Sequence, residues 1–254
     1  MFSPQADICN IQEDLFGFSD DTPCFYQYEK EDMEFLLGYF MGKIDVSCLE
    51  KNLRNLFEIS SGAFDTLVHA WLSELPIEKE AAAFGRKIIG VSQSCTHIEE
   101  KRKAAQKAYL DRGDENTLTV LNAAAKVQHE IHRMMGLLRF TPDADGEYIA
   151  KCSADHFILP ALGEYFSGRF GETSWSIIDE KRGKRLRCLN GERIKLENYT
   201  AFANRLNADE WTGLWIHYHK TINNEDRNNP DLQRQFMPKR YWKYLPEKEE
   251  QQVL

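Results

Sequence analysis

The sequence lacks the features of a membrane protein or a disulfide-stabilised secreted one. No uninterrupted apolar stretch reaches the roughly 18–20 residues that a membrane-spanning helix needs. The N-terminus has no basic region followed by an apolar run, so we expect no signal peptide. Six cysteines are scattered at least 15 positions apart, without a CxxC pair. We therefore expect a cytoplasmic protein with free thiols and no membrane association.

Several ligand-binding motifs are also missing. The patterns GxGxxG, GxxxxGK[ST], GxSxG and DxDxG do not occur, which removes support for dinucleotide, P-loop, serine-hydrolase and calcium-loop functions. The segment HEIHR spaces His129 and His132 three residues apart, whereas the metalloprotease motif HExxH needs a spacing of four. We predict no metal site and no cofactor.

What the chain does contain is enough apolar material for a core, with 42% hydrophobic and 12% aromatic residues. Apolar residues recur at helical spacing up to about 136, and strand and turn patterns begin at about 137. We predict an α+β fold: a helical N-terminal half, and a C-terminal half in which helices flank a small antiparallel sheet. The expected parts are an arm with the first helices (1–60), a helical region (61–136), an α+β region with a basic block (137–247) and a tail (248–254).

Turn residues subdivide the C-terminal half. The segments DADG (143–146), EKRG (180–183) and NG (190–191) predict hairpins between short strands, because Asn-Gly tolerates the positive φ of a tight turn. Proline favours the first turn of a helix, so we expect helices that begin near Pro160 and Pro230. Asn207 or Asp209 is the expected N-cap of a further helix.

The net charge of −8 hides an asymmetry along the chain. Residues 1–180 hold 17 Lys and Arg against 30 Asp and Glu, whereas residues 181–243 hold 14 against 7. Such a distribution suggests a basic face that binds a polyanion. The alternative is that the acidic and basic regions neutralise each other in an internal contact.

The block 227–242, RNNPDLQRQFMPKRYW, concentrates this basic character. It combines three arginines and one lysine with two asparagines, two glutamines, a tyrosine and a tryptophan, and Asp231 is its one acid. Cations and amides contact phosphates and base edges, and aromatic rings stack on bases. In the alternative, the rings pack the last helix onto the core and the cations extend to solvent.

Three residues are candidates for acid–base catalysis: His132, Asp155 and His156. They could act together if the helix around 132 packs beside the helix that follows 156. For Asp155 we favour a structural role as the N-cap of that helix, because a carboxylate there accepts hydrogen bonds from free backbone N–H groups. For His129 and His132 we favour a structural explanation, in which they flank the buried stripe of their helix and are hydrogen-bonded or solvated.

Four segments resemble one bacterial family of DNA metabolism proteins, domain of unknown function 4130. They are VQHEIHRMMGLLRF, SADHFILPALGEYFSGRF, WSIIDEKRGKRLR and NNPDLQRQFMPKRYWKYLPE, and the resemblance extends from about 62 to about 247. The family pattern falls on His132, Arg133, Gly136, Arg139, Phe140, Asp155, His156, Pro160, Phe166, Arg169, Trp175, Asp179, Arg182, Arg227, Asn229, Pro230, Gln233, Met237, Pro238, Arg240, Tyr241 and Trp242.

The resemblance implies an association with DNA and with a radical-SAM protein that modifies or repairs DNA. We therefore expect a DNA-associated accessory protein that acts with such a partner. One alternative is an enzyme that processes a damaged base or nucleotide; another is an adaptor that binds protein and no nucleic acid. The expected nucleic-acid contacts are Arg133, Arg139, Arg169, Arg182, Arg227, Asn229, Gln233, Arg234, Lys239, Arg240, Tyr241 and Trp242.

Overall fold

The computed structural model describes residue 28, residues 30–44, residues 47 and 49, and residues 51–199, 210–222 and 229–251. The chain forms two compact units. Unit 1 comprises Met1–His129 together with His156–Ile158, and unit 2 comprises Glu130–Asp155 together with Leu159–Leu254. The first 27 residues of the expected arm, the expected caps Asn207 and Asp209, and Arg227 lie outside the described residues.

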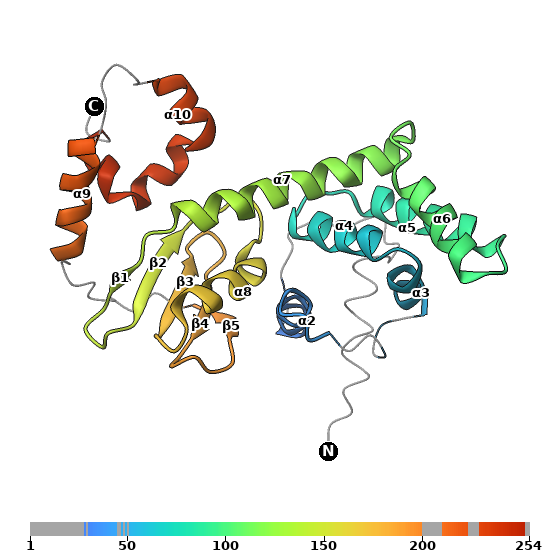
Figure 1. The fold of residues 1–254 in the computed structure, drawn as a ribbon, viewed down its shortest axis with the longest axis horizontal. Helices are drawn as coiled ribbons and strands as arrows, with labels where there is room; N and C mark the ends of the chain where they lie inside the picture. The colour runs from blue at the N-terminus through green and yellow to red at the C-terminus, as the bar shows by residue number, and fades with distance from the viewer. Residues whose placement is uncertain are drawn as a thin grey trace. The chain divides into compact units, whose positions relative to one another are not determined.

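Unit 1 is helical, as the apolar spacing predicts (Figure 1). Its apolar stripes meet in a core that includes Leu36, Leu56, Phe64, Phe84 and Ile88, each no more than 2% exposed. The helices are α2 (Lys30–Phe40), α3 (Lys51–Ile59), α4 (Ser61–Leu72), α5 (Glu78–Gln93), α6 (Ile98–Tyr109) and the first part of α7 (Glu115–Leu137).

Polar caps fix where two of these helices begin. The Ser60 hydroxyl accepts a hydrogen bond from the backbone N–H of Ala63 at the start of α4. The Asp114 carboxylate accepts from the N–H of Thr117 at 3.1 Å, at the start of α7. Each cap satisfies an N–H group that has no partner inside its own helix.

Unit 2 is built on a five-stranded sheet in the order β1-β2-β3-β4-β5. The strand pairs β1–β2, β3–β4 and β4–β5 are antiparallel, as the three turn signals predict. Asn190 and Gly191 both have positive φ, 48° and 71°, between β4 and β5. The strands are β1 (Thr141–Pro142), β2 (Tyr148–Cys152), β3 (Trp175–Asp179), β4 (Lys184–Cys188) and β5 (Lys195–Asn198).

The sheet is mixed rather than purely antiparallel, because β2 and β3 run parallel. Helix α8 (Leu159–Phe170) connects them, and a helical crossover returns the chain so that the second strand runs in the same direction as the first. Phe166 and Phe170 of α8 pack on Trp175, each with ring centroids 6.1 Å apart. The parallel pair places the carboxyl ends of β2 and β3 next to each other, with Cys152 opposite Asp179.

The end of the chain adds short helices to unit 2. They are α9 (Glu210–Ile222), α10 (Pro230–Phe236) and the 3-10 helices η3 (Lys239–Tyr244) and η4 (Pro246–Gln251). Pro230 opens α10 as predicted, and Asn229 caps it by accepting from the N–H of Leu232 at 3.0 Å.

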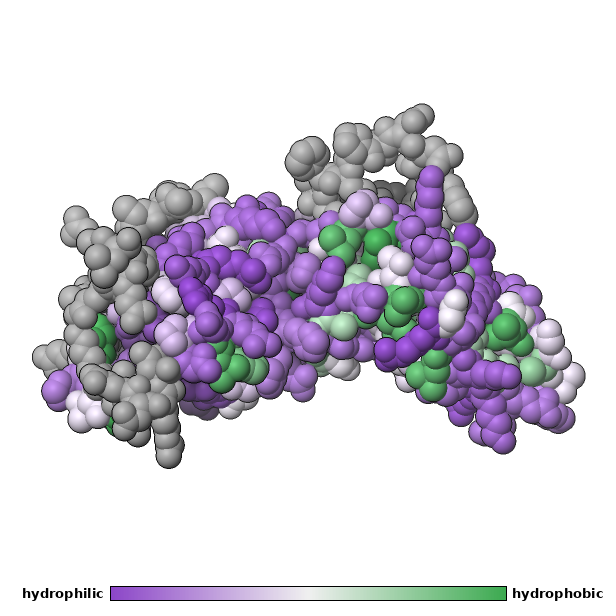
Figure 2. All heavy atoms as spheres, turned by 90° about the horizontal axis from the view of Figure 1, so that it is seen from above, coloured by the Kyte–Doolittle hydropathy of each residue, from purple (hydrophilic) through white to green (hydrophobic). Residues whose placement is uncertain are grey.

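On the face drawn in Figure 2, hydrophilic residues predominate and apolar residues form separate patches. In the described residues, no helix combines the length and the apolar character needed to cross a bilayer.

Candidate nucleic-acid interface

Asp155 lies in the loop after β2 and binds a residue of the basic block. Its Oδ2 atom is 2.7 Å from Nη2 of Arg240, and the two side chains are 48% and 45% exposed. Helix α8 begins only at Leu159, four positions after Asp155. The expected N-cap role of Asp155 is therefore wrong, and its carboxylate instead holds the 3-10 helix η3.

The turn after β3 brings two more cations to Asp155. Lys181 donates from Nζ to the Asp155 carbonyl at 2.8 Å, and Arg182 donates from Nη2 to the same carbonyl at 2.8 Å. Arg182 also binds the Asp179 carboxylate at 2.7 Å. These contacts follow from the parallel pairing, since the loops that leave the ends of β2 and β3 emerge side by side.

A buried acid lies beneath this surface pair. Glu130, on α7, is 2% exposed and accepts the backbone N–H of Asp155 at 2.9 Å. The same carboxylate oxygen accepts the hydroxyl of Tyr241, and Arg240 donates to that hydroxyl at 3.0 Å. We call the connected group the Asp155 network: Glu130, Asp155, Asp179, Lys181, Arg182, Arg240 and Tyr241.

The environment shifts the ionisation of several groups in and beside this network. Burial and the nearby Glu130 raise the pKa of Tyr241 to about 12, so the phenol stays protonated and donates. Burial raises the pKa of Asp179, and Arg182 only partly offsets that effect. Burial also raises the pKa of Cys152 well above its ordinary value, so its thiol is not ionised as a nucleophile would be.

A second acidic residue extends the surface beside the network. Glu180, directly before Lys181, accepts the hydroxyl of Tyr244 at 2.9 Å and lies 3.5 Å from Nζ of Lys243. Lys243 is 53% exposed and Lys181 is exposed. Two chain segments thus contribute solvent-facing cations that we call the cation cluster: Lys181, Arg240 and Lys243.

Other predicted nucleic-acid contacts have partners inside unit 2. Arg139 binds Glu247 at 2.7 Å, and Arg234 pairs with Asp231 three positions earlier. The Trp242 indole N–H donates to the carbonyl of Met237 at 2.9 Å. The acidic and basic residues of unit 2 therefore neutralise each other in part, within the unit itself.

The remaining predicted contacts differ in their exposure. Arg169 and Lys239 are exposed, whereas Arg133 and Gln233 are half-buried. Tyr241 is 1% exposed, so its ring is not accessible for base stacking. The block 227–242 thus presents cations to solvent but holds Tyr241 inside.

The three candidate catalytic residues are not united in one unit. His156 belongs to unit 1, where its Nδ1 lies 3.0 Å from the carbonyl of Ser73. His132 is exposed on the part of α7 that belongs to unit 2. Asp155 is engaged by Arg240. A shared acid–base site of these three residues therefore stays a prediction.

Glu130 and Glu180 are central here although neither is among the predicted site residues. The sequence carries a signal for Glu130, because it lies on the buried stripe of α7 with Val127, Ile131 and Met134. A lone carboxylate on such a stripe needs a buried partner. That partner, Tyr241, is far away in the sequence, so the stripe alone does not identify it.

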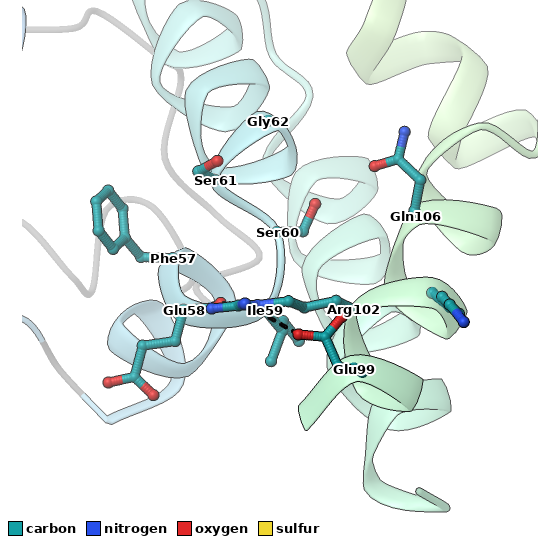
Figure 3. A pocket seen from close by; sticks show the side chains of 10 residues that line it. Phe57, Glu58, Ile59, Ser60, Ser61, Gly62, Glu99, Arg102 and Gln106 are labelled. Carbon is teal, nitrogen blue, oxygen red and sulfur yellow. Dashed lines mark hydrogen bonds and ion pairs between the residues drawn. The ribbon is translucent and has the colours of Figure 1, made fainter. Parts of the chain in front are cut away.

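Unit 1 contains a separate depression of ≈ 700 Å³ between the start of α4 and helix α6 (Figure 3). Three of its polar side chains bind neighbours: Ser60 caps α4, and Arg102 lies 3.7 Å from Glu99 and donates to the Glu58 carbonyl at 3.4 Å. None of the predicted site residues lines it. The Asp155 network is therefore the better candidate for a functional site.

Residues 93–247 match the family described as "Domain of unknown function (DUF4130)", which is more than half of the chain. The chain belongs to the DUF4130 family. The DUF4130 match includes the whole Asp155 network and the cation cluster, but it begins at 93 rather than at the expected 62. No curated protein and no solved structure matches the chain significantly.

Proposed function

We propose that this DUF4130 protein is a DNA-associated accessory protein that contacts the sugar-phosphate backbone through unit 2. The observation that carries the proposal is the cation cluster, in which Lys181 and Arg240 meet at Asp155 although they are far apart in the sequence. Phosphate groups are bound mainly by such lysine and arginine side chains.

The cluster retains binding capacity despite its internal contacts. Arg240 uses Nη2 for both Asp155 and Tyr241, so in the described part of the chain its Nη1 is left for an external acceptor. Burial acts to lower the pKa of Arg240, but its contacts with Tyr241, Asp155 and Glu130 raise it overall. The guanidinium therefore remains charged and fixed in place, which suits it to a phosphate oxygen.

We also propose a process and a partner: the protein acts in DNA repair or modification together with a radical-SAM protein. It is supported by the resemblance of the segments around His132, Asp155, Trp175 and Arg240 to the DNA metabolism family. In such a pairing the partner would perform the chemistry, and this chain would hold the DNA. We rank the enzyme alternative second, because the Asp155 carboxylate that it needs for acid–base catalysis already pairs with Arg240.

The test is DNA binding by the full chain, measured by fluorescence anisotropy over a range of salt concentrations. Each phosphate contact contributes about 0.9 to the slope of log K against log salt on duplex DNA. We expect the double variant Lys181→Gln/Lys243→Gln to bind more weakly and to lower the slope by about 1.8.

The matched control is Lys103→Gln/Lys107→Gln, which removes two exposed lysines from α6 in unit 1. We expect it to bind like the wild type. Absence of DNA binding by the wild type, or equal losses in both double variants, contradicts the proposal.

A further inference from the structure

The described parts of α9 and α10 carry large apolar side chains on the surface. Their exposed fractions run from 40% to 67%, which is unusual for side chains of this size on consecutive helices. Exposed apolar side chains that lie together form a binding surface, and the Trp215 and Tyr218 rings lie together. The residues are Leu214, Trp215, Tyr218, Ile222, Leu232 and Phe236.

Trp215 is exposed and yet held in one orientation. Its indole N–H donates to Oε2 of Glu247 at 3.1 Å, and the guanidinium of Arg139 lies 5.4 Å from the ring centroid. Glu247 in turn binds Arg139 at 2.7 Å, and its side chain is 2% exposed. An aromatic side chain that is already fixed loses little conformational entropy when it binds a ligand.

Tyr218 continues this aromatic surface by one helical turn. Its ring centroid lies 6.0 Å from that of Trp215, with 37° between the ring planes, and 54% of the residue is exposed. Two neighbouring rings of this kind form a stacking platform for successive unpaired bases.

The guanidinium of Arg139 lies over the Trp215 ring and is paired with Glu247. The described segment 229–248 of the same unit adds four exposed cations, Arg234, Lys239, Arg240 and Lys243. Three of them also bind carboxylates, those of Asp231, Asp155 and Glu180. Cations in the same unit as exposed rings suit a polyanion that carries planar groups.

We propose that Trp215 and Tyr218 stack against unpaired bases of single-stranded nucleic acid. This inference rests on the proposed function and adds the form of the ligand. In this proposal the stacking rings belong to α9. The sequence instead predicted Tyr241 and Trp242 of the basic block, whose hydrogen bonds give them structural roles.

The experiment compares the full-length wild type with Tyr218→Ala on single-stranded oligothymidine and on duplex DNA, at one salt concentration. Loss of one stacked base lowers affinity by about 5- to 150-fold. We expect that loss on the single strand only, and we expect Tyr218→Phe to keep the wild-type affinity because the ring remains.

The matched control is Leu214→Ala, which removes an exposed apolar side chain without a ring from the same helix. We expect it to bind the single strand within about twofold of the wild type, since a surface substitution of this kind changes little. Equal losses in Leu214→Ala and Tyr218→Ala, or unchanged binding in Tyr218→Ala, overturn the inference.

The two proposals fail in different ways. If the wild type binds neither form of DNA, the proposed function fails together with this inference. If the wild type binds with the expected salt slope but Tyr218→Ala binds both forms normally, only the stacking is refuted. If Leu214→Ala and Tyr218→Ala instead weaken self-association measured by light scattering, the face is an interface between two copies, which also refutes it.

Discussion

The hydroxyl of Tyr241 donates to the buried carboxylate of Glu130, which joins the 3-10 helix η3 to helix α7. Both residues are no more than 2% exposed. A buried carboxylate that loses a hydrogen-bond donor keeps its desolvation cost without the compensation. This contact is therefore a main attachment of the basic block to the body of unit 2.

Replacing Tyr241 with phenylalanine tests this attachment. We expect Tyr241→Phe to lower the free energy of unfolding by about 1–3 kcal/mol, measured by urea denaturation. Tyr218→Phe, which removes an exposed hydroxyl from α9, is the control and should change stability by less than about 0.5 kcal/mol. Equal effects of the two variants would show that Glu130 does not depend on Tyr241.

Local patterns in the sequence predict much of this fold because each depends on neighbouring residues. The helices up to α8 follow from apolar spacing, and the turn at Asn190 and Gly191 follows from the need for positive φ. Pro230 marks the start of α10 for a similarly local reason. The parallel direction of β2 and β3 is not contained in their own residues, although the helix between them implies it.

The candidate site was less predictable because its contacts join distant segments. Aspartate is a residue type that often caps helices, and Asp155 precedes one. Only the folded chain shows that Asp155 binds Arg240 instead. Tyr241 and Trp242 are residue types that often stack on bases. The residue type alone does not distinguish a ring that faces solvent from one that packs inside. The role of the cations as nucleic-acid contacts stays a prediction, and their carboxylate partners, Asp155 and Glu180, depend on tertiary structure.

Under the proposed function, the Asp155 carboxylate competes with a DNA phosphate for Arg240. In Asp155→Asn, the guanidinium loses its counter-charge and one negative charge leaves the cation cluster, so we expect DNA affinity to rise by about 3- to 10-fold at low salt. Anisotropy titrations at two salt concentrations measure this change. The control Glu164→Gln removes an exposed charge from α8 and should change affinity by less than about twofold. A weaker-binding Asp155→Asn that remains fully folded would contradict the role of Arg240.

Glu147 makes the stability of unit 2 depend on pH in the acidic range. Its carboxylate binds Arg185 at 2.5 Å and Arg187 at 2.6 Å, and its side chain is 6% exposed. Burial acts to raise the pKa of Glu147, but the hydrogen bonds from Arg187, Ser176 and Arg185 lower it overall. The folded carboxylate thus resists protonation more than the unfolded one, whose pKa is about 4.3. Its stabilising effect is present above that pH and is lost as the pH falls through the folded pKa.

We expect Glu147→Gln to destabilise the protein by about 1–3 kcal/mol near neutral pH, because two arginines lose their shared counter-charge. The difference from the wild type should shrink as the pH falls below about 4.3. Urea denaturation at several pH values measures it, and Glu164→Gln should follow the wild type throughout. A difference that stays constant with pH would exclude this ionisation as the cause.

Gly191 is required by the β4–β5 turn for two reasons. Its φ is +71°, and a Cβ built on it would lie 3.1 Å from Cα of Glu172 and 3.2 Å from the carbonyl oxygen of Gly171. Both are backbone atoms that cannot move aside, so we expect Gly191→Ala to cost about 1–3 kcal/mol of unfolding free energy.

The control is Gly168, which is exposed on α8 and has no atom within 4 Å of a Cβ built on it. Gly168→Ala should therefore stabilise the protein by about 0.5–1 kcal/mol, since alanine favours a helix over glycine. Thermal unfolding of both variants should shift the midpoint in opposite directions, and shifts of the same sign would contradict this account of the turn.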